Sequence, residues 1–213
     1  MKRLVVTMFA IVLMFTLCSS SVFAGGLTGK GLKGGLNFAN LRGDGVENLG
    51  FGTLDSKMGL CAGGFIEWGI NDMFAIQPEV LFAMKGAKKE VEVQGGTLKV
   101  TLNVNYLEIP VLVRLSMPNQ RSVVPNLFFG PYVAIKLSGK LKVELGDQSA
   151  EEDISEDIKT TDFGVVVGAG VDFALGSREF TVEARYTLGL IDASEWGYDI
   201  KNGVISFMVG YSL

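Results

Sequence analysis

The stretch NYLEIPVLVRL, residues 105–115, sets the question of the fold because it places an acid and a base inside an otherwise apolar run. Successive side chains of an extended chain point to opposite faces. The odd-numbered residues 107–115 therefore share a wholly apolar face, while Glu108 and Arg114 lie on the other. A soluble sheet would bury the apolar face in its core, whereas a transmembrane barrel would turn it to lipid and the charges to its lumen.

The N-terminus predicts export from the cytoplasm. Residues 1–3 carry two basic side chains, residues 4–18 are almost entirely apolar, and the run ends in the cleavage pattern VFA. This is the pattern of a secretory signal peptide. We expect a signal peptide at residues 1–24 and one barrel domain at residues 25–213. Cys61 is then the single cysteine, so no intrachain disulfide is expected.

Composition narrows the class of protein and of partner. The chain has 19 basic and 23 acidic residues, and loss of Lys2 and Arg3 with the signal leaves 17 against 23, a net charge of −6. An acidic chain is a poor partner for nucleic acid. The 28 glycines and only 5 prolines indicate many strands and turns.

Period-two alternation recurs along the chain and predicts eight strands. Besides the opening stretch, the alternating segments are 32–38, 58–70, 74–84, 127–137, 163–173, 180–188 and 205–213. Residues 100–106 alternate on even numbers before the odd series begins at Leu107. This change of phase predicts a β-bulge near Asn105.

The connections alternate between long and short. Long polar segments follow the first, third, fifth and seventh strands, at residues 42–57, 88–99, 139–161 and 191–202. Short or moderate turns follow the others, at residues 71–72, 117–126 and 175–178. This alternation is typical of bacterial outer-membrane barrels. The sequence therefore predicts an all-β fold, an eight-stranded antiparallel up-and-down transmembrane β-barrel in the cell outer membrane.

The face opposite the apolar one carries charges interleaved with glycine. Glycine weakens a strand that faces water, but in a narrow lumen it makes room for large side chains from neighbouring strands. We therefore expect the charged face to line the lumen as a structural ion-pair network. Its predicted members are Glu79, Glu108, Arg114, Lys136, Asp162, Asp172, Glu183 and Arg185.

The order of several motifs resembles one family. GLKGGLNFANL, IQPEVLFAMKGAKK, NYLEIPVLVRL, FFGPYVAIKLSG, TTDFGVVVGAGVDF and TVEARYTLGLIDAS follow one another as in the PorT-like outer-membrane β-barrel family. The resemblance implies an eight-stranded outer-membrane barrel, and some relatives serve protein secretion and gliding. The chain departs from such barrels in ending on Leu213 instead of an aromatic residue.

The sequence contains no histidine, which argues against several kinds of enzyme. Without histidine there is no Ser-His-Asp arrangement and no His-ligated zinc. Acid pairs such as Glu79 with Glu108, or Asp162 with Asp172, resemble those of glycoside hydrolases, but beside inward bases they are better read as ion pairs. We therefore predict no catalytic residue, no cofactor and no metal site.

Two loop motifs could have a specific function, cell adhesion or calcium binding. The sequence favours a plain solvated loop for both. RGD, residues 42–44, matches a cell-adhesion ligand, and residues 151–157 are rich in acids. The acidic segment lacks the spaced acids and central glycine of a calcium loop. Like charges in such a run repel one another and stay in water.

Three functions from different classes remain. The favoured one is a non-enzymatic monomer in outer-membrane lipid, a scaffold or binding protein that meets a protein partner through extracellular loops or the periplasmic rim. A role in protein secretion is what the PorT-like resemblance implies. The alternatives are a small pore and a soluble lipocalin-like carrier, which would need an apolar lumen.

Overall fold

The computed structural model describes the chain in seven stretches, residues 26–44, 54–93, 96–117, 123–146, 148–176, 178–194 and 199–213. The predicted signal peptide, residues 1–24, lies outside these stretches. Within them, no helix is long and apolar enough to cross a membrane. Strands make up most of the described chain, in agreement with the all-β prediction.

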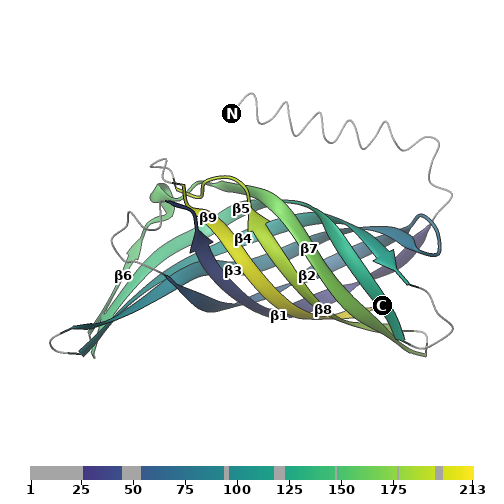
Figure 1. Ribbon diagram of the computed structural model, residues 1–213, viewed down its shortest axis with the longest axis horizontal. Helices are drawn as coiled ribbons and strands as arrows, with labels where there is room; N and C mark the ends of the chain where they lie inside the picture. Colours follow the sequence, from purple (N-terminus) through teal and green to yellow (C-terminus); the bar gives the residue numbers. More distant parts are fainter. Residues whose placement is uncertain are drawn as a thin grey trace, which may run out of the picture.

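The strands close into a ring. The described residues form β1 (Leu27–Arg42), β2 (Asp55–Gly69), β3 (Phe74–Val93), β4 (Gly96–Ser116), β5 (Val123–Leu145), β6 (Gln148–Asp153), β7 (Thr161–Leu175), β8 (Arg178–Gly189) and β9 (Lys201–Ser212). The antiparallel order is β4-β3-β2-β1-β9-β8-β7-β5, and pairing of β4 with β5 closes eight strands (Figure 1). Among the described strands, β6 pairs only with β5 and stays outside the ring. The predicted eight-stranded barrel is confirmed.

The two faces of the wall divide as the alternation predicts. On β7, Val167 is 55% exposed on the outer face, whereas its neighbour Val166 is 1% exposed in the interior. The charges of the opening stretch, Glu108 and Arg114, are 4% and 5% exposed. Both point into the lumen, so the apolar face of β4 is the outer face of the barrel.

The predicted β-bulge is present, but its extra residue lies in the partner strand. Asn105 pairs with Ser138 and Tyr106 pairs with Lys136, so Leu137 of β5 has no opposite residue. The phase therefore changes in β5. Even-numbered residues of β4 stay inward on both sides of the bulge, and Tyr106 is 1% exposed. The apolar even-numbered residues of 100–106 therefore face inward.

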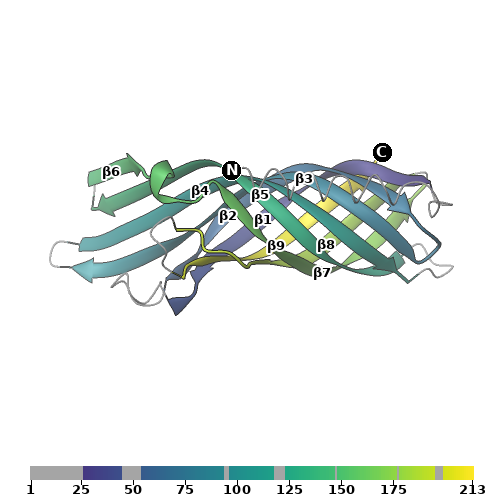
Figure 2. The same ribbon diagram turned by 90° about the horizontal axis from the view of Figure 1, so that it is seen from above.

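Three long strands continue past the ring at the end opposite the short turns. β3 and β4 form a hairpin that ends at Val93 and Gly96, and β5 forms a second hairpin with β6. We call residues 88–93, 96–101, 140–145 and 148–153 the extension. Figures 1 and 2 show it as a sheet that projects beyond the other strands.

The extension corrects the prediction of polar connections at residues 88–99 and 139–161, which are strand for much of their length. Both segments contain charged residues in period-two alternation with aliphatic ones, as in KKEVEV. Such charges indicate a loop when the sequence is taken alone. Where a strand continues beyond a membrane, however, its outer face meets water and can carry charged side chains. The acidic residues 151–153 likewise belong to β6.

The depth of an outward residue should decide how much a charge costs there. Val167 and Leu175 both lie on the outer face of β7, 55% and 60% exposed, but Leu175 ends the strand at the short turn. We expect Val167→Arg to cost about 2 to 4 kcal/mol of stability in lipid vesicles and Leu175→Arg about 0 to 1 kcal/mol. Urea unfolding of the two variants measures this difference. Equal midpoints would mean that the outer face does not span a bilayer.

Candidate functional site

Seven of the eight side chains predicted for the lumen are buried in the structure. They are Glu79, Glu108, Arg114, Asp162, Asp172, Glu183 and Arg185. They come from β3, β4, β7 and β8, so closure of the ring brings together residues that are distant in sequence. They lie in three clusters rather than in one continuous chain of ion pairs.

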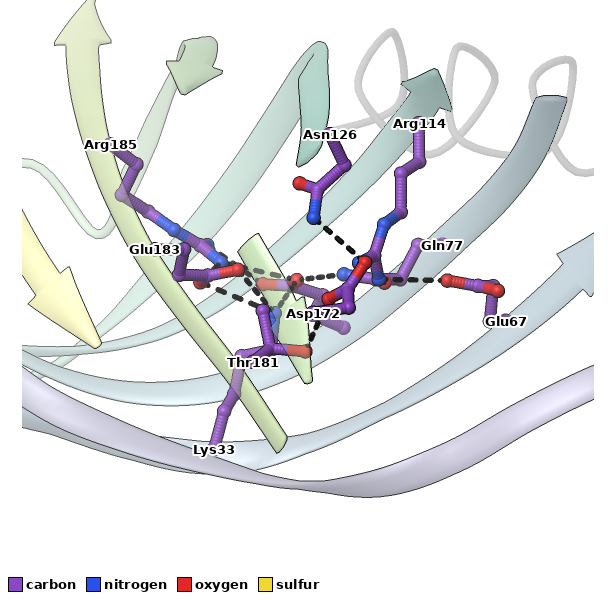
Figure 3. A network of polar contacts seen from close by, with 10 residues as sticks. Lys33, Glu67, Gln77, Arg114, Asn126, Asp172, Thr181, Glu183 and Arg185 are labelled. Atoms are coloured by element: carbon purple, nitrogen blue, oxygen red, sulfur yellow. Dashed lines mark hydrogen bonds and ion pairs between the residues drawn. The ribbon is translucent and has the colours of Figure 1, made fainter. Parts of the chain in front are cut away.

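The first cluster is centred on Glu79 of β3. Its carboxylate accepts from Lys33 Nζ at 2.7 Å and from Arg185 Nη1 at 2.8 Å. Glu183 pairs with the same two bases, with Lys33 Nζ at 3.1 Å. Figure 3 shows the side chains of Lys33, Glu183 and Arg185 converging across the lumen. Two acids and two bases therefore neutralise one another away from water.

The second cluster is centred on Arg114 of β4. Its guanidinium pairs with Asp172 and donates to Glu67 Oε2 at 2.9 Å. Asp172 also accepts from Asn126 Nδ2 at 2.9 Å and from Thr181 Oγ1 at 2.8 Å (Figure 3). Hydrogen bonds to the charged form of a carboxylate compensate its loss of water.

Gln77 joins these two clusters. Its Nε2 donates to Glu79 Oε1 at 2.7 Å, and its Oε1 accepts from Arg114 Nη1 at 3.0 Å. A neutral amide thus places a donor against the acid of one cluster and an acceptor against the base of the other. The two clusters form one hydrogen-bonded network through β3.

The third cluster lies nearer the extension. Lys85 Nζ is 2.6 Å from Glu108 Oε2, 3.6 Å from Asp162 Oδ2 and 4.6 Å from the centre of the Tyr132 ring. Asp162 accepts from the Tyr132 hydroxyl and from Asn202 Nδ2, each at 2.9 Å. Aromatic rings therefore hold the lysine from the side while two acids balance its charge.

Lys136 does not join the lumen clusters. It follows the last inward residues of β5, directly before the bulge, and its ammonium group donates to the backbone carbonyls of Ser155 and Ile158. Ser155 begins the short 3-10 helix η2 (Ser155–Asp157), and Ile158 directly follows it. Lys136 thus fastens the segment after β6 to the barrel, and its predicted place in the ion-pair network is corrected.

Two further bases, Lys33 and Lys85, pair with acids in the lumen; the alternation predicts Lys85 on the charged face, whereas Lys33 is not among the predicted residues. Lys33 stands between the outward residues Leu32 and Gly34, so its inward direction follows from the same alternation that was used for Glu108. Lys85 alternates with outward Met84 in the same way. The period was the available signal for both residues, but which acid each base would meet depends on the closure of the ring.

The buried charges balance in number. Buried bases among the described residues are Lys33, Lys57, Lys85, Arg114 and Arg185, and buried acids are Glu79, Glu108, Asp162, Asp172 and Glu183. A buried charge is costly unless it is paired and hydrogen-bonded. Four of the five bases pair with these acids, whereas Lys57 donates to the backbone carbonyl oxygen of Lys85 at 3.3 Å. Among the described residues, no group of three or more cysteine, aspartate or glutamate side chains is placed to hold a metal ion.

Aromatic side chains fill the space that inward glycines leave. A Cβ atom added at Gly164 would lie 2.7 Å from the Tyr132 ring, and one at Gly168 would overlap the Phe128 ring. Tyr132 and Phe128 are 1% and 3% exposed. The predicted use of glycine is therefore seen at both positions, where the missing side chain admits a ring from β5.

A small cavity lies between the clusters. A cavity of about 10 Å³ lies among residues that include Asn37, Cys61, Lys85, Glu108, Arg185 and Ser206. Such a volume holds about one water molecule. The cavity is too small for an organic substrate.

The extension has a different chemistry from the lumen. Its inner face continues the lumen face of β3, β4 and β5 with mostly aliphatic side chains, of which Val91, Val93 and Leu145 are 40%, 41% and 40% exposed. The same face also carries Lys89, opposite Val100, and Glu152, opposite Leu141. Its outer face carries charges such as Lys99 and Glu144, which are cross-strand neighbours. The extension therefore presents a mostly apolar inner surface outside the part of the wall that is apolar on its outer face.

The acidic end of β6 is fixed by the start of η2. The backbone N–H of Ser155 donates to Asp153 Oδ1 at 2.9 Å. Hydrogen bonds from the hydroxyl and the backbone of Ser155 lower the pKa of the Asp153 carboxyl. This carboxylate remains ionised at neutral pH, beside the other acids of β6.

Comparison with known proteins places the fold. The model of the family described as "Outer membrane protein beta-barrel domain" matches residues 28–195. No curated protein matches the chain.

Several solved structures are similar at low identity. The attachment invasion locus protein Ail of Yersinia pestis is 17% identical, with a TM-score of 0.45 over 87% of this chain and 99% of its own. Neisserial surface protein A is 16% identical, with a TM-score of 0.45 over 88% and 99%. OprG of Pseudomonas aeruginosa is 14% identical, with a TM-score of 0.45 over 89% and 98%. Nothing about the activity of this chain follows from similarities at this level.

Removal of the central acid should show what the lumen network contributes to stability. Glu79→Gln keeps the shape of the side chain but leaves Lys33 and Arg185 with Glu183 as their one remaining acid. We expect a loss of about 3 to 5 kcal/mol in the free energy of unfolding. Glu90→Gln is the control, because its side chain is 43% exposed and its ion pairs are 3.5 and 3.8 Å long. Urea midpoints that shift equally for both would refute a stabilising network.

Proposed function

Because the chain belongs to the outer membrane protein beta-barrel domain family, we propose that it is a non-enzymatic outer-membrane barrel that binds a protein partner through its extension. The outer face of the ring meets lipid in this proposal, and the extension stands outside the bilayer. The short turns face the periplasm, as in other bacterial barrels.

One observation supports the proposal: paired charges and aromatic rings point into the lumen, while the extension leaves aliphatic side chains about 40% exposed. The cavity of about 10 Å³ among these side chains has room for about one water molecule. By contrast, exposed apolar residues that neighbour one another on a surface are typical of protein contact sites. Val91 and Leu145 flank Leu98 in one row across three strands of the extension.

The motifs that resemble PorT-like barrels suggest one class of partner. In that class, the extension or the periplasmic rim would hold a component of a protein secretion system. The extension is the favoured surface, because it combines a mostly apolar inner face with charged residues on its outer face and at its edge in β6.

A pore is the second function that the sequence leaves open, and the side chains in the lumen oppose it. We expect no stable conductance steps from the purified barrel in a planar bilayer, because rings and paired charges occupy the interior of an eight-stranded barrel. A known porin reconstituted in the same bilayer is the positive control. Reproducible single-channel steps that scale with the amount of barrel would contradict a plugged lumen.

The role of the extension is tested by charges placed on one face or the other. Val91→Lys with Leu145→Lys adds two positive charges to the inner face, and Thr97→Lys with Thr101→Lys adds the same two to the outer face. We expect the inner-face variant to lose its cross-linked partner in intact outer membranes and the outer-face variant to keep it.

Both variants must first show the heat-dependent gel shift of a folded barrel, which separates loss of binding from loss of folding. Equal capture of the same partner by both variants would move the contact surface away from the inner face of the extension.

A further inference from the structure

The outer wall is hollowed near the short-turn end of β1 to β4. The hollow has a volume of about 480 Å³, and its lining includes Gly31, Gly64, Ile66, Pro78, Val80 and Ile109. Gly64 faces outward between Leu32 of β1 and Val80 of β3. Because Gly64 has no side chain, it leaves a gap in a row of aliphatic residues.

The floor of the hollow reaches three inward residues, Gly31, Phe65 and Glu79. The Glu79 carboxylate is already engaged by Lys33, Gln77 and Arg185. The outward side chains of the lining are apolar apart from Lys30, and the backbone N–H of Leu213, which also lines the hollow, donates to the Lys30 carbonyl oxygen at 2.8 Å. The hollow therefore suits an apolar chain with a polar group at one end only.

Lys30 is the single charge on this part of the outer face. The outer face of β1 to β4 consists of the even-numbered residues of 28–38, 56–68 and 74–84 and the odd-numbered residues of 103–115, and Lys30 is the only charged side chain among them. It is exposed, lies three residues from the start of β1 and has Ile66 as its cross-strand neighbour. A cation on an apolar wall is costly unless it reaches water or an anion.

We propose that the hollow beside Lys30 binds an anionic phospholipid of the periplasmic leaflet, with the phosphate on the Lys30 ammonium group and one acyl chain in the hollow. The site rests on the proposed contact of the outer face with lipid. Its position near the short turns places Lys30 at the level of the headgroups, and lysines there attract anionic lipids.

The length of the hollow agrees with one acyl chain. It crosses four neighbouring strands, and three strand spacings amount to about 14 Å. One leaflet contributes about half of a hydrocarbon core that is about 30 Å thick, which is a similar length. A chain lying across β1 to β4 would restore the apolar contacts that Gly64 leaves open.

The test uses tryptophan fluorescence of the full barrel in vesicles. Trp68 is 41% exposed on the outer face of β2, two residues from Ile66, and Trp196→Phe makes it the single tryptophan. Phosphatidylcholine vesicles receive either phosphatidylglycerol or phosphatidylcholine brominated in one acyl chain, and quenching gives a relative binding constant. We expect about a five-fold preference for the anionic lipid, the factor that one lysine near a membrane surface contributes.

Matched variants separate the headgroup from the hollow. Lys30→Gln should abolish the preference, so that both lipids bind about equally. Lys30→Arg should keep the preference, and so should Arg178→Gln, which removes the outward base of β8 at the same end of the barrel. Gly64→Leu should weaken quenching by both lipids. Gly34→Leu changes an outward glycine of β1 that lies outside the hollow, and this variant should leave quenching unchanged.

The outcomes are distinguishable. Equal quenching by the two lipids in the parent protein, or a preference that survives Lys30→Gln, would refute the lipid site and show that Lys30 only reaches water. No quenching by either lipid would instead refute the contact of the outer face with the bilayer, and with it the proposed function. If Gly64→Leu does not fold, the Lys30 variants still decide.

Discussion

Closure of a narrow ring is the constraint on which the rest of the structure depends. A strand that crosses a bilayer must have all its backbone groups paired, which only a closed barrel achieves. Pairing of β4 with β5 closes the ring. With eight strands, the interior is just wide enough for side chains to fill it. Every inward residue must therefore be small, or be a large residue whose neighbours make room, or be a charge with a partner.

The paired charges of the lumen also specify the register of the strands. A slip of one residue would turn every side chain to the opposite face, so Glu79 and Arg114 would enter the apolar outer face. A buried ion pair is not in itself better than packed apolar residues. The network that Gln77 joins is better understood as a penalty on wrong registers. Glu79 meets Arg185, and Arg114 meets Asp172, only when the ring has closed in the correct register.

The sequence predicts the strands and the direction of their side chains, because both follow a period of two. It does not predict contacts that depend on how the strands pair in the closed ring. Alternation identifies the strands of the ring and the inward direction of Glu108 and Arg114. It cannot tell that Lys136 turns to the carbonyls after β6, because the bulge at Leu137 is read from the pairing of two strands. The charges of the extension are typical of a loop, but a strand whose outer face meets water carries charges with the same period of two.

Closure of the narrow ring also explains why the lumen and the extension differ in chemistry. An interior that side chains fill has little freedom to bind anything, so any recognition must use surfaces that closure does not occupy. β6 is such a surface, because it lies outside the ring, and its acidic residues Glu151, Glu152 and Asp153 are exposed. Charges on an edge strand discourage pairing with arbitrary strands. In the proposed function, specific recognition uses the mostly aliphatic inner face of the extension, where a partner would have to match both the spacing of the rows and the curvature of the sheet.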